Sequence, residues 1–133
     1  LSRRQRQMCI RDREKAVCSN LIAKGLSYEY ESILETKLEE MKLFDGKDLT
    51  DVDKEFHDTL IQATGNHLWA VLMEAVTDAY RDWINYVIEL ADESVRVKLL
   101  QCHADIYQNL EQKNEPAMLL AIDRHYDLIE QMD

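Results

Sequence analysis

Apolar side chains recur at intervals of three and four residues along nearly the whole chain, which is the spacing of one face of an α-helix. Gly, Asn, Asp and Pro residues interrupt this pattern at short intervals and are typical of helix caps and turns. The pattern therefore predicts six helices, over about 14–25, 27–44, 48–64, 67–90, 95–113 and 116–132.

Each predicted helix has an apolar row that we expect to face a core. In the third helix this row is Val52, Phe56, Leu60 and Ala63. In the long fourth helix it is Leu68, Leu72, Ala75, Ala79, Trp83, Tyr86 and Leu90. Because short turns join long helices, we expect an all-α fold, an antiparallel bundle of about six helices.

The first thirteen residues differ from the rest of the chain. They hold five of the 16 basic residues and little apolar periodicity, and 7–12 resembles the translation of a common sequencing adapter. We therefore predict that 1–13 is a non-native or disordered segment and that 14–133 is one domain. The alternative is a native basic arm, which could bind nucleic acid.

The composition argues against several classes of function. The net charge of -10 argues against DNA binding by this chain, because DNA affinity depends on neutralising phosphates. No apolar run approaches the length of a membrane span. Cys9, Cys18 and Cys102 are odd in number and lack C-x-x-C spacing, which indicates reduced thiols. We expect a cytoplasmic protein with no membrane contact.

Histidines fall on or beside the apolar rows in a pattern that suggests a metal site. Asp53 and His57 are four residues apart and leave the same helix face. His103 and His125 each lie eleven residues from Asn114, so a hairpin there places both about 16 Å below the turn. His57 lies about 13 Å below its own turn. One Asp and three His from three helices can therefore converge.

Imidazole nitrogens and a carboxylate suit a divalent transition metal, with zinc preferred and nickel or manganese as alternatives. Four protein ligands could close a tetrahedral site, or leave two octahedral positions open for water or a ligand. The alternative is three core histidines that are hydrogen-bonded to their neighbours.

The same residues carry a family resemblance. Asp53-x3-His57, the stretch from Phe56 to Asn66, and the pair His103 and His125 resemble the C-terminal FCD domain of GntR-type transcription regulators, more narrowly the FadR-like subfamily. The resemblance runs from Glu14 to the end. It implies an all-α bundle, a metal held by Asp53, His57, His103 and His125, a small carboxylate effector on or beside the metal, and a homodimer. It also implies that DNA is bound by a winged helix-turn-helix domain, which is missing here.

A carboxylate effector would be held by a cation. The family's first helix often supplies an arginine, but here that region holds only Arg11 and Arg13 of the doubtful segment. The metal, Arg81, Arg96 and Arg124 remain as candidates. We predict Arg81, with Tyr80 and Asn66, as effector-binding residues. The alternative is that Arg81 faces solvent.

The leading hypothesis is a non-enzymatic, metal-containing sensor that changes DNA binding by the missing domain. A metal-dependent hydrolase is the second hypothesis, because an open metal position can activate water. It would need a free base, and Glu55 is expected to point elsewhere. The third hypothesis is a metal-free helical interaction module.

Overall fold

A computed structural model describes residues 2–132, which form six α-helices without a strand. The all-α prediction is therefore confirmed for this part of the chain. None of the helices in this range is both long and apolar enough to cross a membrane. The helices are α1 (Arg3–Lys24), α2 (Tyr28–Leu43), α3 (Gly46–Ala63), α4 (His67–Glu89), α5 (Glu93–Glu111) and α6 (Glu115–Gln131).

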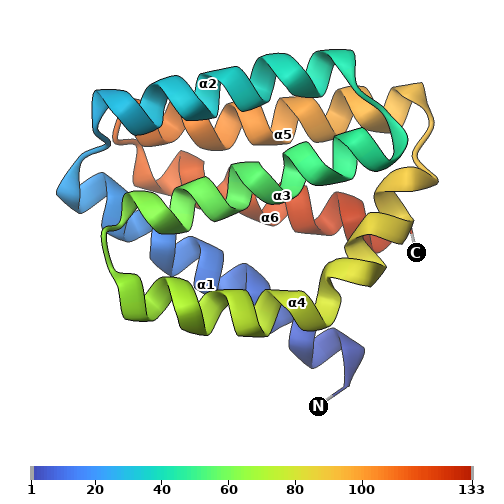
Figure 1. Cartoon of the computed structure of the whole chain (residues 1–133), viewed down its shortest axis with the longest axis horizontal. Coiled ribbons are helices and arrows are strands. Elements are labelled where there is room, and N and C mark those ends of the chain that lie inside the picture. The colour runs from blue at the N-terminus through green and yellow to red at the C-terminus, as the bar shows by residue number, and fades with distance from the viewer. Residues whose placement is uncertain (1, 133) are drawn as a thin grey trace.

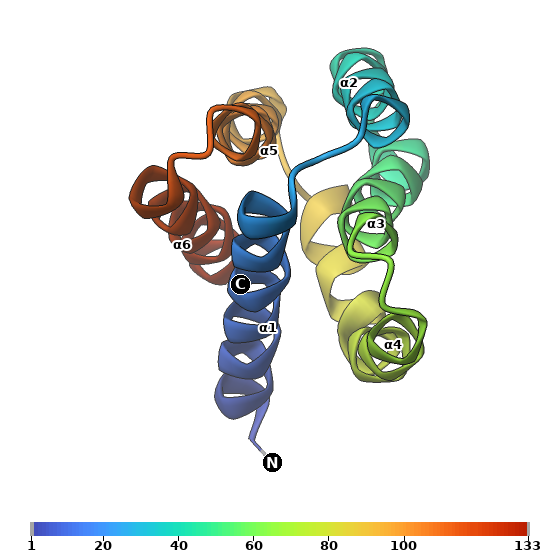
Figure 2. The same cartoon turned by 90° about the vertical axis from the view of Figure 1, so that its left-hand side faces the viewer.

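The helices form an antiparallel bundle in which α3 folds back along α2, α4 along α3 and α6 along α5 (Figure 1). Helix α3 packs between α2 and α4, and α5 packs on α6. Helix α1 lies against α6 and also contacts α3, α4 and α5, so it closes the bundle (Figure 2). This arrangement brings α3, α5, α6 and α1 together around one interior.

Side chains cap the first turns of four of the helices that follow α1. Ser27, Asn66, Asp92 and Asn114 each accept a hydrogen bond from the backbone N–H three residues later. Helix α3 begins at Gly46 rather than at the predicted Asp48, and α5 begins at Glu93 rather than at about 95.

The turn between α3 and α4 depends on Gly65. Its φ of 70° lies in the left-handed region, and a Cβ there would lie 2.9 Å from Lys24 Nζ. That ammonium donates to the carbonyl oxygens of Ala63 at 3.3 Å and Thr64 at 2.9 Å, at the C-terminal end of α3. Gly65 therefore leaves space for Lys24 of α1 to bind the C-terminal end of α3, the helix that carries Asp53 and His57.

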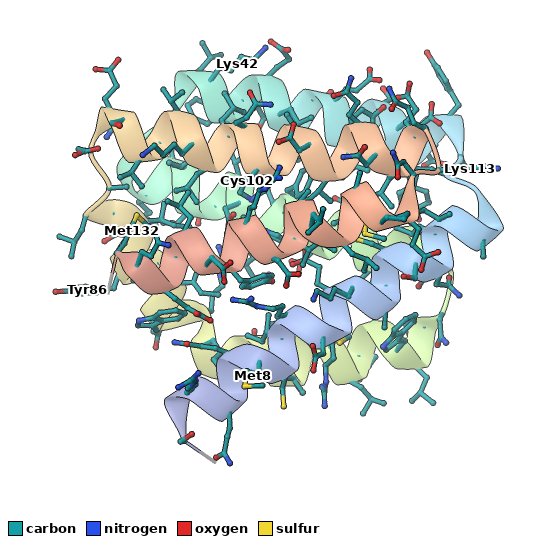
Figure 3. All side chains as sticks on the ribbon, turned by 180° about the vertical axis from the view of Figure 1, so that it is seen from behind. Met8, Lys42, Tyr86, Cys102, Lys113 and Met132 are labelled. Atoms are coloured by element: carbon teal, nitrogen blue, oxygen red, sulfur yellow. The ribbon has the colours of Figure 1, made fainter. Side chains whose placement is uncertain are left out.

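The predicted core face of α4 is wrong. Leu68 is 69% exposed and Leu72 is 55% exposed. Tyr86 and Leu90 are also exposed, and Tyr86 points away from the bundle (Figure 3). The side chain of Ala79 lies outside the described residues. The helix is apolar on more than one side, and the side that packs on the bundle consists of Met73, Tyr80, Ile84, Val87 and Ile88.

The N-terminal segment also differs from expectation. Helix α1 begins at Arg3, so residues 3–13 are helical and the predicted disorder is wrong for them. Gln7 and Ile10 are buried. Arg11 lies 2.9 to 3.3 Å from three carboxylates of α6, those of Asp123, Asp127 and Glu130. Whether this segment is native stays a prediction.

Candidate metal centre

Three helices bring the four predicted ligands together. Helix α3 supplies Asp53 and His57, α5 supplies His103, and α6 supplies His125. Each offers a ligand atom, and these atoms lie within 4.8 Å of one another. Asp53, His103 and His125 are each 2% exposed, and His57 is partly buried. The predicted convergence of these side chains is confirmed.

The hydrogen bond that His103 makes through Nδ1 leaves the lone pair on its other ring nitrogen, Nε2, which faces this cluster. Its Nδ1 donates to the carbonyl oxygen of Leu99 at 2.6 Å, and a carbonyl can only accept. In the neutral imidazole Nε2 then carries the lone pair. That Nε2 lies 2.8 Å from Asp53 Oδ1 and 3.2 Å from His57 Nε2. Acceptors this close repel one another unless a proton or a metal cation lies between them.

His125 supplies the clearest test of whether a metal fits. Both of its ring nitrogens are buried and make no hydrogen bond within the described structure. Its ring centroid is 4.5 Å from that of His103 and 5.0 Å from that of His57. Burial and these two neighbours hold the pKa of His125 well below its usual range, so the ring is neutral. An unpartnered neutral imidazole beside two others and a carboxylate fits a divalent transition metal.

Charge in the cluster is dominated by two carboxylates. Burial would raise the pKa of Asp53, but His57 and Arg81 outweigh it and hold that pKa well below the ordinary value. Burial would lower the pKa of His57, but the carboxylates of Glu14 and Asp53 raise it to about 10. In the metal-free protein a proton on His57 therefore supplies the cation, and a metal would replace it.

Arg81 does not face solvent, and its guanidinium is turned to the ligand Asp53 through Nη2, while its buried Nε has no hydrogen-bond partner in the described structure. Its Nη2 donates to Asp53 Oδ2 at 2.9 Å and to the carbonyl oxygen of Thr50 at 2.8 Å. Tyr80 is buried in the core, and Asn66 caps α4. Of the three residues predicted to bind effector, the structure therefore brings only Arg81 to the ligand cluster, where it holds the ligand Asp53.

A small cavity of about 30 Å³ lies beside His57, with room for a water molecule. No Lys or Arg is among the described residues that line it, so its walls hold no cation for a carboxylate. The lining residues come from α1, α3, α4 and α6, and are Ile10, Glu14, Val17, His57, Leu60, Ile61, Met73, Thr77 and Tyr126.

Sequence reasoning missed Glu14, which is buried and contacts His57 Nδ1 and the Tyr126 hydroxyl through its two carboxylate oxygens. The sequence did contain a signal that Glu14 is buried. Glu14 precedes Val17 and Leu21 by three and seven residues, so a carboxylate sits in the apolar row of its helix. A buried acid needs partners, and the histidine cluster supplies one.

The sequence model of the FCD domain matches residues 18–128, which include all four converging side chains. The chain belongs to the FCD domain family. FCD domains are the C-terminal, ligand-sensing regulatory domains of GntR-family regulators, so the family resemblance is confirmed at this level. Searches of curated proteins and of solved structures found no match. Glu14 precedes the matched stretch of this FCD domain.

Proposed function

We propose that this FCD domain holds a divalent transition metal through Asp53, His57, His103 and His125, and senses a small carboxylate at or beside that metal. The observation that carries the proposal is His125, a fully buried imidazole with two unpartnered nitrogens beside three other ligand groups. Zinc is the preferred metal because nitrogen ligands with one carboxylate are typical of its sites, and nickel or manganese are alternatives.

The charge of the cluster favours an anionic effector. With Glu14 and Asp53 ionised and Arg81 protonated, the protein groups carry one net negative charge when the histidines are neutral. A divalent metal turns this into one net positive charge in a buried place, which attracts a carboxylate. Since no Lys or Arg lines the described walls of the cavity beside His57, the metal itself would be the main cation for an effector bound there.

The size of the cavity beside His57 limits what can bind there without a structural change. The cavity of about 30 Å³ holds a water, so an organic acid would have to widen it. Widening moves apolar side chains of α1 and α4, and this is how effector binding would change the domain's shape. If the effector binds one arrangement of the domain more tightly than another, it shifts the equilibrium between them and so changes the DNA affinity of the N-terminal domain.

Thermal denaturation with carboxylates tests the effector proposal. Zinc-loaded and chelated protein would each be heated with a panel of mono-, di- and tricarboxylates. We expect at least one acid to raise the Tm of the zinc-loaded protein and none to raise that of the chelated protein. Equal shifts with and without zinc would contradict binding at the metal.

A second copy of the chain is the proposed partner, and exposed apolar residues on α4 are the proposed contact. Leu68, Val71 and Leu72 are each more than half exposed. Two copies that each carry a net charge of -10 repel, so their contact should be an apolar patch rather than the acidic surface. The same helix in both copies then forms a self-complementary interface.

We propose that the domain is regulatory and not an enzyme, and that it works in the cytoplasm, where a regulator meets DNA. A metal-dependent hydrolase would need a free base near the metal. Glu14 is the carboxylate on the cavity wall, and both of its oxygens are engaged by His57 and Tyr126. We expect no metal-dependent turnover of ester, amide or phosphate substrates, and robust turnover would overturn this.

A further inference from the structure

Helix α1 supplies no ligand to the cluster, yet it sends one buried carboxylate to it. Glu14 Oε1 contacts Nδ1 of His57, and Glu14 Oε2 accepts from the hydroxyl of Tyr126. Glu14 thus joins three helices, with α3 on one oxygen and α6 on the other. A buried carboxylate with both oxygens engaged is held in one orientation.

This contact decides which nitrogen of His57 is available to a metal. A carboxylate can only accept, so the hydrogen bond requires the proton on Nδ1. The other nitrogen, Nε2, then faces the cluster, 3.2 Å from His103 Nε2 and 3.4 Å from Asp53 Oδ1. Without an acceptor at Nδ1, the ring could carry its proton on either nitrogen and could turn.

Glu14 and the carbonyl of Leu99 have the same role at two histidines. Leu99 accepts from Nδ1 of His103, and Glu14 accepts from Nδ1 of His57. In both rings Nε2 is left toward the centre. Partners of this kind fix the tautomer and orientation of metal-bound histidines. The carbonyl cannot be removed by substitution, whereas the Glu14 side chain can.

We propose that Glu14 is a positioning residue of the metal centre, which holds the proton on His57 Nδ1 so that Nε2 is the ligand atom. Tyr126 in turn holds Glu14. This inference rests on the proposed metal site, and it extends the site to Glu14, on the part of α1 that precedes the matched stretch 18–128.

Cobalt titration of the full chain tests this proposal, because Co²⁺ occupies such sites and its visible spectrum reports its ligands. We expect Glu14→Leu to weaken Co²⁺ binding by about 10- to 100-fold and to change the spectrum. Glu14→Gln keeps an acceptor but loses the charge, so we expect a loss of about 3- to 10-fold. Leu21→Ala, at a buried position on the same helix, is the matched control and should lower the Tm without changing Co²⁺ affinity or spectrum.

Nitrogen-15 NMR of the zinc-loaded protein supplies a readout that a packing role would not move. We expect a slowly exchanging, downfield Nδ1 proton on His57 in the parent, shifted upfield in Glu14→Gln. In Glu14→Leu, which has no acceptor for this proton, we expect its signal to lose the downfield shift and to broaden by exchange. If Glu14→Leu does not fold, the Glu14→Gln comparison decides. Unchanged affinity and an unchanged Nδ1 proton in the variants would overturn the role of Glu14 and leave the metal site standing. A parent that binds no Co²⁺ would overturn both.

Discussion

Replacing His125 by leucine should stabilise the metal-free protein while abolishing metal binding. The two ring nitrogens of His125 are buried without hydrogen-bond partners. A buried unsatisfied polar group costs about 1–3 kcal/mol, and an apolar side chain removes that cost. Imperfect packing of leucine in the histidine's place costs up to about 1.5 kcal/mol. We therefore expect His125→Leu to raise the free energy of unfolding by about 1 kcal/mol in chelator.

For a domain of this size, about 1 kcal/mol corresponds to a Tm increase of roughly 3–4 °C. With zinc bound, the parent should have a higher Tm than His125→Leu, which is the reverse of their order in chelator. At a free zinc concentration of 100 times the Kd, the parent gains about 2.7 kcal/mol, whereas a variant that lacks a ligand gains much less. The assay is thermal denaturation of parent and variant at one protein concentration, in EDTA and in zinc.

His67→Gln is the matched control, because His67 is an exposed histidine at the start of α4 and a polar replacement does not enlarge the apolar patch of Leu68, Val71 and Leu72. It should change neither the metal-free Tm nor the zinc-induced shift. The reasoning would be refuted if His125→Leu lowered the metal-free stability by more than about 2 kcal/mol, the loss expected of a well-satisfied core histidine. It would also be refuted if the variant kept the full zinc-induced shift.

Three further predictions follow from the same cluster and from α4. The pKa of His57 is raised from its ordinary value of 6.5 to about 10, so its contribution to metal-free stability is complete below about pH 6.5 and is lost as the pH rises toward 10. Zinc must displace this proton, so the zinc-induced Tm shift should grow between pH 6 and pH 8.5, and a flat profile would count against it. Arg81→Gln should destabilise the metal-free protein by about 1–3 kcal/mol, because it removes the cation at Oδ2 of the buried Asp53 and leaves protonated His57 beside Oδ1. The loss should be smaller in zinc, as chemical denaturation in both conditions would measure. Leu68→Glu with Leu72→Glu should yield a monomer by analytical ultracentrifugation, whereas Leu120→Glu, an exposed leucine on α6, should not.

The ligand cluster could be predicted because its geometry is local to helices and tight turns. The spacing of Asp53 and His57 within one helix, and of His103 and His125 about Asn114, fixes their heights from the rise of a helix. All four side chains also lie in or beside apolar rows, which face the core in α3, α5 and α6.

The packed face of α4 and the partners of the cluster could not be predicted in the same way. Helix α4 is apolar on more than one side, so periodicity alone did not decide between Leu72 and Met73 as its inward residue. The pairing of Arg81 with Asp53 depends on where α4 packs on α3. Glu14 was missed because its helix was expected to begin there, so the apolar row around it was not recognised.

Metal content of the purified protein tests the central claim most directly. Elemental mass spectrometry would be applied to the parent, to the double variant His103→Ala/His125→Ala, and to His67→Ala as a control histidine outside the cluster. We predict close to one zinc, nickel or manganese ion per chain in the parent and the control, and background levels in the double variant. A parent without metal, even after reconstitution with each of these ions, would contradict the metal centre and the effector mechanism built on it.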